Sequence, residues 1–153
     1  MMHRIAEFLP EGGVAVDIGA SMDGDNWLDP MMGRAGRVHA FEPDPKAFAK
    51  LQERYGTRTN LVLVNKACSD NDGDVPLGRY GTHLSMLFDG EADLTVPSIR
   101  LDSYFAVEPR IDFLKIDVDG SEYAVLSGAR KVINSNPGIK LVVEIHTRWL
   151  EQH

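Results

Sequence analysis

Two apolar stretches of this sequence end abruptly in carboxylates. Residues 38–41 are followed by Glu42 and Pro43, and residues 113–116 are followed by Asp117. Such a run is typical of a buried parallel strand, which delivers the residue behind it to the carboxyl edge of the sheet. Ligands of open α/β sheets bind in the crevice at that edge. The pattern therefore predicts a small-molecule site that contains these acids.

Glu42 is placed to hold a ribose, because an acid after the second strand of a nucleotide-binding sheet accepts hydrogen bonds from ribose hydroxyls. The alternative is an exposed glutamate that only ends a strand. Neither G-x-G-x-x-G nor G-x-x-x-x-G-K-[ST], the glycine loops that cradle phosphates, is present. A ribose acid without a phosphate loop predicts a nucleoside cofactor that has no phosphates. S-adenosylmethionine is the common cofactor of that kind.

Two further turns fit the same site. Residues 17–20 (DIGA) end the first predicted strand, and Gly19 permits a sharp turn and close approach of a ligand to the backbone. Any turn from strand to helix also favours Asp and Gly. Ser69 and Asp70 follow the third predicted strand, where an adenine would lie, and a simple polar turn explains them equally well.

Charged side chains crowd the end of the fourth predicted strand: Lys115, Asp117, Asp119 and Glu122. Acids near one basic residue shift one another's pKa, and they can position a hydroxyl, take its proton or bind a divalent cation. Helix capping by Asp119 or Ser121 is the alternative. We assign Asp117 to chemistry and Asp119 or Ser121 to capping.

Glu144 and His146 lie two residues apart near the end of the fifth predicted strand, so they are expected to share a face. They could form an acid–base pair or add metal ligands, and a solvated pair is an equal alternative. The sequence leaves a metal requirement open.

Strands and helices alternate along the chain, which predicts a doubly wound, mostly parallel α/β sheet. The irregular stretch from 74 to 100 is expected to form the wall of an acceptor site or an edge hairpin. Apolar runs predict strands at 14–18, 38–41, 61–64, 74–79, 94–99, 112–116 and 141–145, and helical spacing predicts a short helix near Pro30 and helices over 45–55 and 122–134.

Composition limits the partners. The formal net charge of -7 and the absence of a Lys/Arg run argue against a nucleic-acid partner. No apolar run is long enough to cross a membrane, and no signal peptide is evident, so we expect a cytoplasmic protein. Cys68 is the single cysteine, which excludes an intrachain disulfide.

With these residues in place, the sequence resembles the FkbM-type S-adenosylmethionine-dependent methyltransferases, over residues 14–146. The resemblance implies a Rossmann-like methyltransferase sheet and O-methyl transfer to a hydroxyl of a sugar or small metabolite. Its marks are residues 16–20 (VDIGA), 40–44 (AFEPD), 111–122 (IDFLKIDVDGSE), 125–129 (VLSGA) and 143–146 (VEIH).

The resemblance also assigns roles to residues. In the first loop, Ser21 and Asp23 stand where the family usually has Asn and Gly, and Gly24 comes one residue late. The family's sheet adds two strands after the fifth, so the resemblance predicts one domain over residues 1–153 that lacks these strands.

Cofactor binding is expected from Asp17, Gly19, Ala20, Glu42, Pro43, Ser69 and Asp70, and methyl transfer from Lys115, Asp117, Asp119 and His146.

Two other functions compete with methyl transfer. The altered first loop favours an inactive S-adenosylmethionine-binding domain that serves as a partner or scaffold subunit. A nicotinamide oxidoreductase is disfavoured by the missing glycine pattern. An apolar fifth strand at the edge of the sheet is prone to pair with another chain, so we also expect either a homo-oligomer through this edge or residues after His146 that fold back over it.

Overall fold

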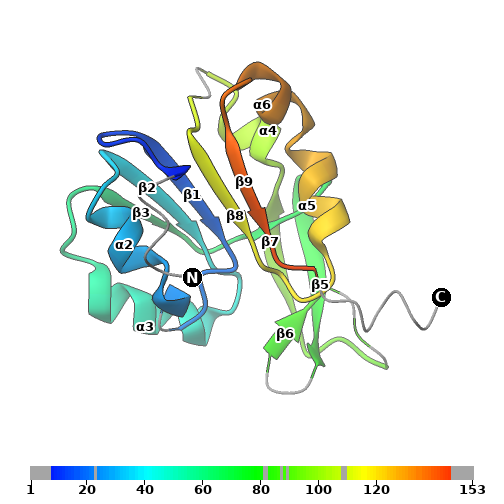
Figure 1. Cartoon of the computed structure of the whole chain (residues 1–153). Coiled ribbons are helices and arrows are strands. Elements are labelled where there is room, and N and C mark those ends of the chain that lie inside the picture. Colours follow the sequence, from blue (N-terminus) through cyan, green and yellow to red (C-terminus); the bar gives the residue numbers. More distant parts are fainter. Residues whose placement is uncertain are drawn as a thin grey trace.

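The computed structural model describes residues 8–22, 24–80, 83–86, 88, 90–107 and 110–145. A five-stranded parallel sheet forms its centre, in the order β3-β2-β1-β8-β9 (Figure 1). The strand order reverses between β1 and β8, which is where doubly wound sheets bind ligands. The α/β fold predicted from the sequence is confirmed. The strands are β1 (Val14–Ile18), β2 (Arg37–Phe41), β3 (Leu61–Val64), β8 (Phe113–Ile116) and β9 (Lys140–Val143).

Helices cover both faces of this sheet. On one face, α2 and α3 pack Met31 and Leu51 against Val38 and Phe113. On the other, α4, α5 and α6 pack their apolar side chains against a second cluster that includes Ile116. Among the described helices we find none that is both long and apolar enough to span a bilayer. The helices are η2 (Gly24–Asn26), α2 (Leu28–Met32), α3 (Pro45–Tyr55), α4 (Leu101–Tyr104), α5 (Glu122–Gly128) and α6 (Arg130–Ser135).

A second, four-stranded sheet has the order β4-β7-β5-β6 and its own small core around Val75, Leu77 and Val96. The sequence predicts strands at 74–79 and 94–99, which are β5 and β7, but not their pairing or the two short strands beside them. The strands are β4 (Ala67–Cys68), β5 (Gly73–Tyr80), β6 (His83–Ser85) and β7 (Leu94–Ile99).

The helix expected over residues 122–134 is wrong in one respect, because it is two helices that meet at Ala129. The Asp102 carboxylate of α4 accepts hydrogen bonds from the backbone N–H groups of Lys131 (3.1 Å) and Val132 (2.9 Å). A carboxylate in this position satisfies the first N–H groups of a helix. The cap from α4 therefore starts a new helix, α6. The apolar pattern of the sequence runs on from α5 into α6 without a break, so it does not reveal this start.

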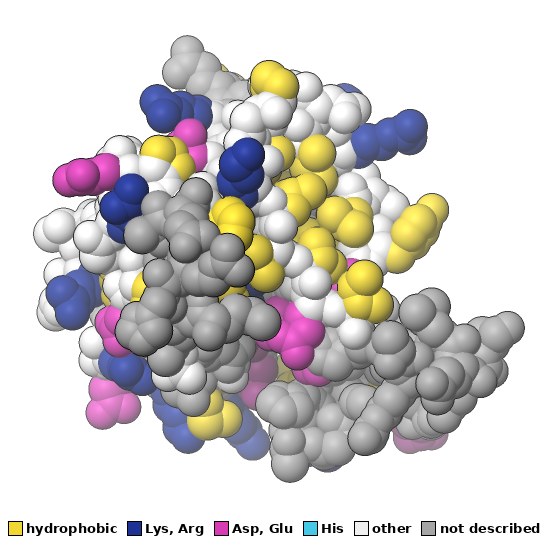
Figure 2. All heavy atoms as spheres, in the orientation of Figure 1, with side chains coloured by type: hydrophobic (Ala, Val, Ile, Leu, Met, Phe, Trp, Pro, Cys, Tyr) yellow, Lys and Arg dark blue, Asp and Glu magenta, His cyan; other side chains and the backbone are white. Residues whose placement is uncertain are grey.

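The fifth strand is shorter than the sequence predicts. It ends at Val143, so Glu144 follows the strand instead of lying in it. Within the described residues β9 pairs with β8 alone, which leaves its other side as an edge. Figure 2 shows apolar side chains gathered on the face that carries β9 and α5. Leu141 of β9 and Tyr123 of α5 are exposed.

Candidate functional site

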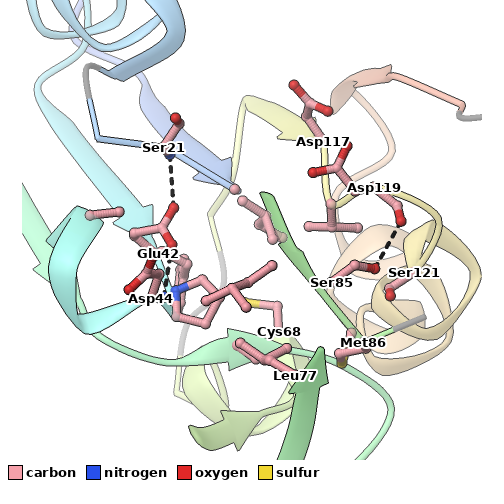
Figure 3. A pocket seen from close by; sticks show the side chains of 18 of the residues that line it. Ser21, Glu42, Asp44, Cys68, Leu77, Ser85, Met86, Asp117, Asp119 and Ser121 are labelled. Carbon is pink, nitrogen blue, oxygen red and sulfur yellow. Dashed lines mark hydrogen bonds between the residues drawn. The ribbon is translucent and has the colours of Figure 1, made fainter. Parts of the chain in front are cut away.

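A cavity of about 300 Å³ opens where the carboxyl ends of β1, β2 and β8 meet the second sheet (Figure 3). This volume lies at the lower end of the range of small-molecule sites. Acidic side chains stand on two opposite sides of the cavity: Glu42 on one side, Asp117 and Asp119 on the other. Between them lies an apolar floor that includes Leu77 and Met86. Leu84 also lines the cavity.

Glu42 is buried at the end of β2, with 6% of its surface exposed. One carboxylate oxygen, Oε2, accepts the backbone N–H of Ser21 at 2.8 Å, and the other, Oε1, accepts that of Asp44 at 2.8 Å. Glu42 therefore joins the loop after β1 to the start of α3. A carboxylate offers about four acceptor positions, so two backbone bonds do not exhaust it.

Asp44 and Pro43 extend this side of the cavity. The Asp44 carboxylate accepts the backbone N–H of Lys46 at 2.8 Å and caps α3, with Pro45 at the first helical position. This cap fixes where α3 begins and so holds the backbone beside Glu42.

Gly19 lets the loop after β1 pass close to β8. Its φ is +82°, and a Cβ at this position would lie 1.8 Å from the carbonyl oxygen of Asp117. The backbone N–H groups of Gly19 and Ala20 both donate to the carbonyl of Phe41, at 3.1 Å. Gly19 lines the cavity, whereas Ala20 is fully buried in the core beneath it.

Asp17 and Lys115 lie underneath the cavity and do not line it. They are register partners on β1 and β8, and their charged groups are 3.0 Å apart and buried. The Lys115 ammonium also donates to the carbonyl oxygen of Gly19 at 3.1 Å and lies 3.7 Å from the Asp117 carboxylate. Lys115 is thus a positioning residue that holds three parts of the site together.

Asp117 and Asp119, at the carboxyl end of β8, both line the cavity. Asp119 has a φ of +51°, a conformation that Asp tolerates better than most residues. The hydroxyl of Ser85, from β6, donates to the carbonyl oxygen of Asp119 at 2.9 Å. The second sheet therefore holds the loop that carries both acids.

The predicted capping by Asp119 or Ser121 is wrong. Ser121 occupies the N-cap position of α5, but no side-chain hydrogen bond caps the helix. The Glu122 carboxylate accepts the backbone N–H of Gly120 at 2.9 Å instead. Asp119 is held by its backbone, and its side chain faces the cavity.

The structure does not bring Ser69 and Asp70 to the cavity wall. The Ser69 hydroxyl pairs with that of Ser98 at 2.6 Å, and the Asp70 side chain is exposed. Their neighbour Cys68 does line the cavity, and burial raises the pKa of its thiol well above the usual value. His146 lies outside the described residues, while Glu144 reaches the cavity.

Several lining residues carry no signal in the sequence. Lys66 and Ser85 stand in turns or short strands without a motif, and only the packing of the second sheet brings Ser85 to the site. Among the described residues, no group of three or more His, Cys, Asp and Glu side chains is arranged to hold a metal ion.

Comparisons with known proteins point to a family of methyltransferases. A family model described as "Methyltransferase FkbM domain" matches residues 17–153. The chain is 30% identical over 117 residues to the hexuronic acid methyltransferase AglP of Haloferax volcanii, which covers 71% of this chain and 47% of that protein. It is 27% identical over 144 residues to the 2-O-methyltransferase NoeI of Sinorhizobium fredii, with 78% and 58% covered. The chain thus spans about half the length of these relatives.

Among solved structures, the chain is similar to an FkbM methyltransferase from Methylobacillus flagellatus KT, with a TM-score of 0.63 and 24% sequence identity. The match covers 86% of this chain and 32% of the other. At this identity the likeness concerns the fold.

Proposed function

The chain belongs to the FkbM methyltransferase domain family, and from this membership and the site we propose that it is an S-adenosylmethionine-dependent O-methyltransferase. Its acceptor is a hydroxyl of a sugar or small metabolite. The observation that carries the proposal is the buried Glu42 at the end of β2, which faces Asp117 and Asp119 across one cavity.

The residues present fit this cofactor. Glu42 would accept the ribose hydroxyls, as an acid after the second strand does in dinucleotide sheets. At Gly19 the backbone lacks a side chain on the cavity wall, so a ligand can approach it closely. S-adenosylmethionine supplies a methyl group that is already activated on a positively charged sulfonium.

The charges of the cavity match a cationic ligand. The described lining residues include five carboxylates and one ammonium, that of Lys66. Opposite charges within a partly enclosed site attract more strongly than they do in bulk water. The carboxylates are Glu42, Asp44, Asp117, Asp119 and Glu144.

The chain's own part in the reaction is alignment and proton transfer. Holding an acceptor hydroxyl in line with the donor supplies much of the rate, and the apolar floor keeps water out. Asp117 is the base of this proposal: its carboxylate takes the proton as the hydroxyl oxygen is methylated. The bonds of Lys115 to Asp17 and Gly19 keep the β8 end beside the first loop.

The names of the two relatives support the acceptor class. One is a hexuronic acid methyltransferase and the other a 2-O-methyltransferase, so both names are consistent with transfer to a hydroxyl-bearing small molecule.

Calorimetry with S-adenosylmethionine, its demethylated product and NAD, together with an assay of methyl transfer, tests the proposal. We expect the first two ligands to bind, NAD to fail, and labelled methyl groups to appear on an acceptor. Binding of S-adenosylmethionine without methyl transfer to any hydroxyl compound would favour an inactive cofactor-binding subunit. This is the second candidate function, because the first loop departs from the pattern usual in the family. Binding of NAD alone would contradict the proposal.

A further inference from the structure

The peptide group between Asp119 and Gly120 is held at both of its polar atoms. Its carbonyl oxygen accepts the hydroxyl of Ser85 at 2.9 Å, and its N–H donates to Oε1 of Glu122 at 2.9 Å. Both side chains are buried, with 2% of Ser85 and 8% of Glu122 exposed. Buried hydrogen bonds are costly to break, because the separated groups are left unsatisfied. The orientation of this peptide is therefore fixed from two sides, by β6 and by α5.

The two residues that this peptide joins both have a left-handed backbone. The φ angle is +51° at Asp119 and +104° at Gly120. Glycine adopts such angles at little cost, whereas a residue with a side chain keeps them only where its surroundings impose them. Residues held in this way cluster at functional sites. The strained backbone of Asp119, beside a cavity, therefore indicates that the position of its side chain matters.

The direction of the Asp119 carboxylate depends on this peptide, because the backbone on either side of a residue sets where its side chain points. Figure 3 shows the Asp119 side chain on the side of the cavity that also carries Asp117, opposite Glu42. If Glu42 holds the ribose, this side receives the acceptor. A carboxylate there can accept a hydrogen bond from the acceptor hydroxyl and align it for transfer.

Ser85 reaches Asp119 from 34 positions earlier in the chain, through the β5–β6 hairpin of the second sheet. In this hairpin Ser85 lies opposite Gly78. A Cβ at Gly78 would lie 2.1 Å from the ring of Phe88, so the missing side chain lets that ring pack on β5. The hairpin is thus closely packed where it presents Ser85. The second sheet gives the site a specific hydrogen bond as well as an apolar wall.

We propose that Ser85 is a positioning residue for methyl transfer. Together with Glu122 it clamps the peptide between Asp119 and Gly120, and this clamp aims the Asp119 carboxylate at the acceptor hydroxyl. The proposal rests on the proposed function, in which Asp117 remains the base. Ser85 acts through Asp119 and does not itself contact the acceptor. The second sheet is then a working part of the site, because its hairpin holds Asp119 in the strained conformation.

The first test needs no ligand and compares Ser85→Ala with Ser98→Ala. Ser98 is a matched control, because it is also a buried serine of the second sheet, and its hydroxyl bonds Ser69 and the carbonyl of Asn71 instead. We expect the amide of Gly120 to exchange about tenfold faster in Ser85→Ala than in the wild type, measured by NMR. In Ser98→Ala it should exchange at the wild-type rate. An unchanged rate in Ser85→Ala would refute the clamp.

The second test measures transfer from S-adenosylmethionine to a panel of methyl glycosides. Ser85→Ala should lower kcat about tenfold, the effect of losing one hydrogen bond that holds the geometry, and change KM and cofactor affinity less than twofold. Ser98→Ala should lower the unfolding temperature and leave kcat unchanged. Asp119→Asn removes the charge but tolerates a left-handed backbone. In that background Ser85→Ala should lower kcat no further, because no carboxylate is left to aim.

Three results would overturn the assignment. Losses of kcat that multiply in the double variant would show that Ser85 acts without Asp119. A lower unfolding temperature in Ser85→Ala with unchanged kcat would give Ser85 a structural role alone. A wild-type protein that methylates none of the glycosides would contradict the proposed function and the role of Asp119 with it. The exchange rate of Gly120 would even then confirm or refute the clamp itself, so the two failures are distinguishable.

Discussion

Glu42 and Asp117 stand on opposite sides of one cavity, and their surroundings differ. Glu42 is almost fully buried and accepts two backbone N–H groups. The Asp117 side chain is 21% exposed and lies 3.7 Å from the Lys115 ammonium. A carboxylate fixed by backbone bonds is suited to hold a ligand, whereas one that faces the cavity more openly can exchange a proton with it.

Replacing Glu42→Ala removes the acceptor that we assign to the ribose. We expect affinity for S-adenosylmethionine to fall about ten- to a hundredfold, since a hydrogen bond to a charged group contributes about 1.5–3 kcal/mol. Calorimetry measures this change, with Glu53→Ala as a control for the loss of an exposed charge on α3. Unchanged affinity in the Glu42 variant would remove the main support for the cofactor assignment.

Replacing Asp117→Asn keeps the shape of the side chain and removes the base. We expect turnover to fall by about two orders of magnitude or more, the usual contribution of a general base, with cofactor affinity nearly unchanged. Steady-state kinetics and calorimetry on the same preparation separate the two quantities. An equal loss of both would place Asp117 in the cofactor pocket.

Among the elements, those defined by local patterns were predictable and those defined by distant contacts were not. Buried apolar runs located β1, β2, β3 and β8 to within one residue. The break between α5 and α6 depends on Asp102, about thirty positions earlier in the chain, which no local pattern can reveal. For the same reason the sequence does not predict that Leu84 and Ser85 line the site. They reach the cavity only when the second sheet packs against the end of β8.

The contact between β2 and α4 carries a pH dependence. The Nδ1 atom of His39 lies 2.9 Å from the Tyr104 hydroxyl oxygen. Burial lowers the pKa of His39 below its usual value of 6.5, and the positive charge of Arg37 lowers it further by a smaller amount. The unfolded chain therefore binds a proton more readily than the folded one. The contribution of neutral His39 to the free energy of unfolding is fully present above pH 6.5. It is lost as the pH falls from there through the lowered pKa of the folded state.

We expect His39→Asn, which cannot titrate, to lose less stability than the wild type between about pH 7.5 and 5. Urea unfolding at several pH values measures both curves. The absolute stability of the variant will be lower, because the imidazole packs edge-on against Tyr104 and Phe105, so the slopes are the quantity to compare. Parallel curves would show that His39 does not titrate in this range.

At the level of the whole molecule, the outer edge of β9 is the feature with the largest consequence. Within the described residues β9 has one neighbour, and Leu141 is 41% exposed on it, with Ile145 at 64% just beyond. An apolar strand edge presents unpaired N–H and C=O groups to other chains unless something covers it. Association between copies of the chain would cover both the edge and these side chains.

We predict that the protein self-associates through this edge. Light scattering over a dilution series should show a mass that rises with concentration. Amide exchange at Leu141 and Val143 should slow as the mass rises, because the N–H groups of Lys140 and Glu144 donate to β8 and the alternation along β9 directs those of Leu141 and Val143 to the outer edge. Leu141→Lys should weaken the association, because a charge on an edge strand opposes pairing, whereas Val107→Lys, at an exposed site in the segment between α4 and β8, should leave it unchanged. A monodisperse monomer with fast exchange at β9 would show that the protein tolerates the open edge, and the expectation of an oligomer would then be wrong.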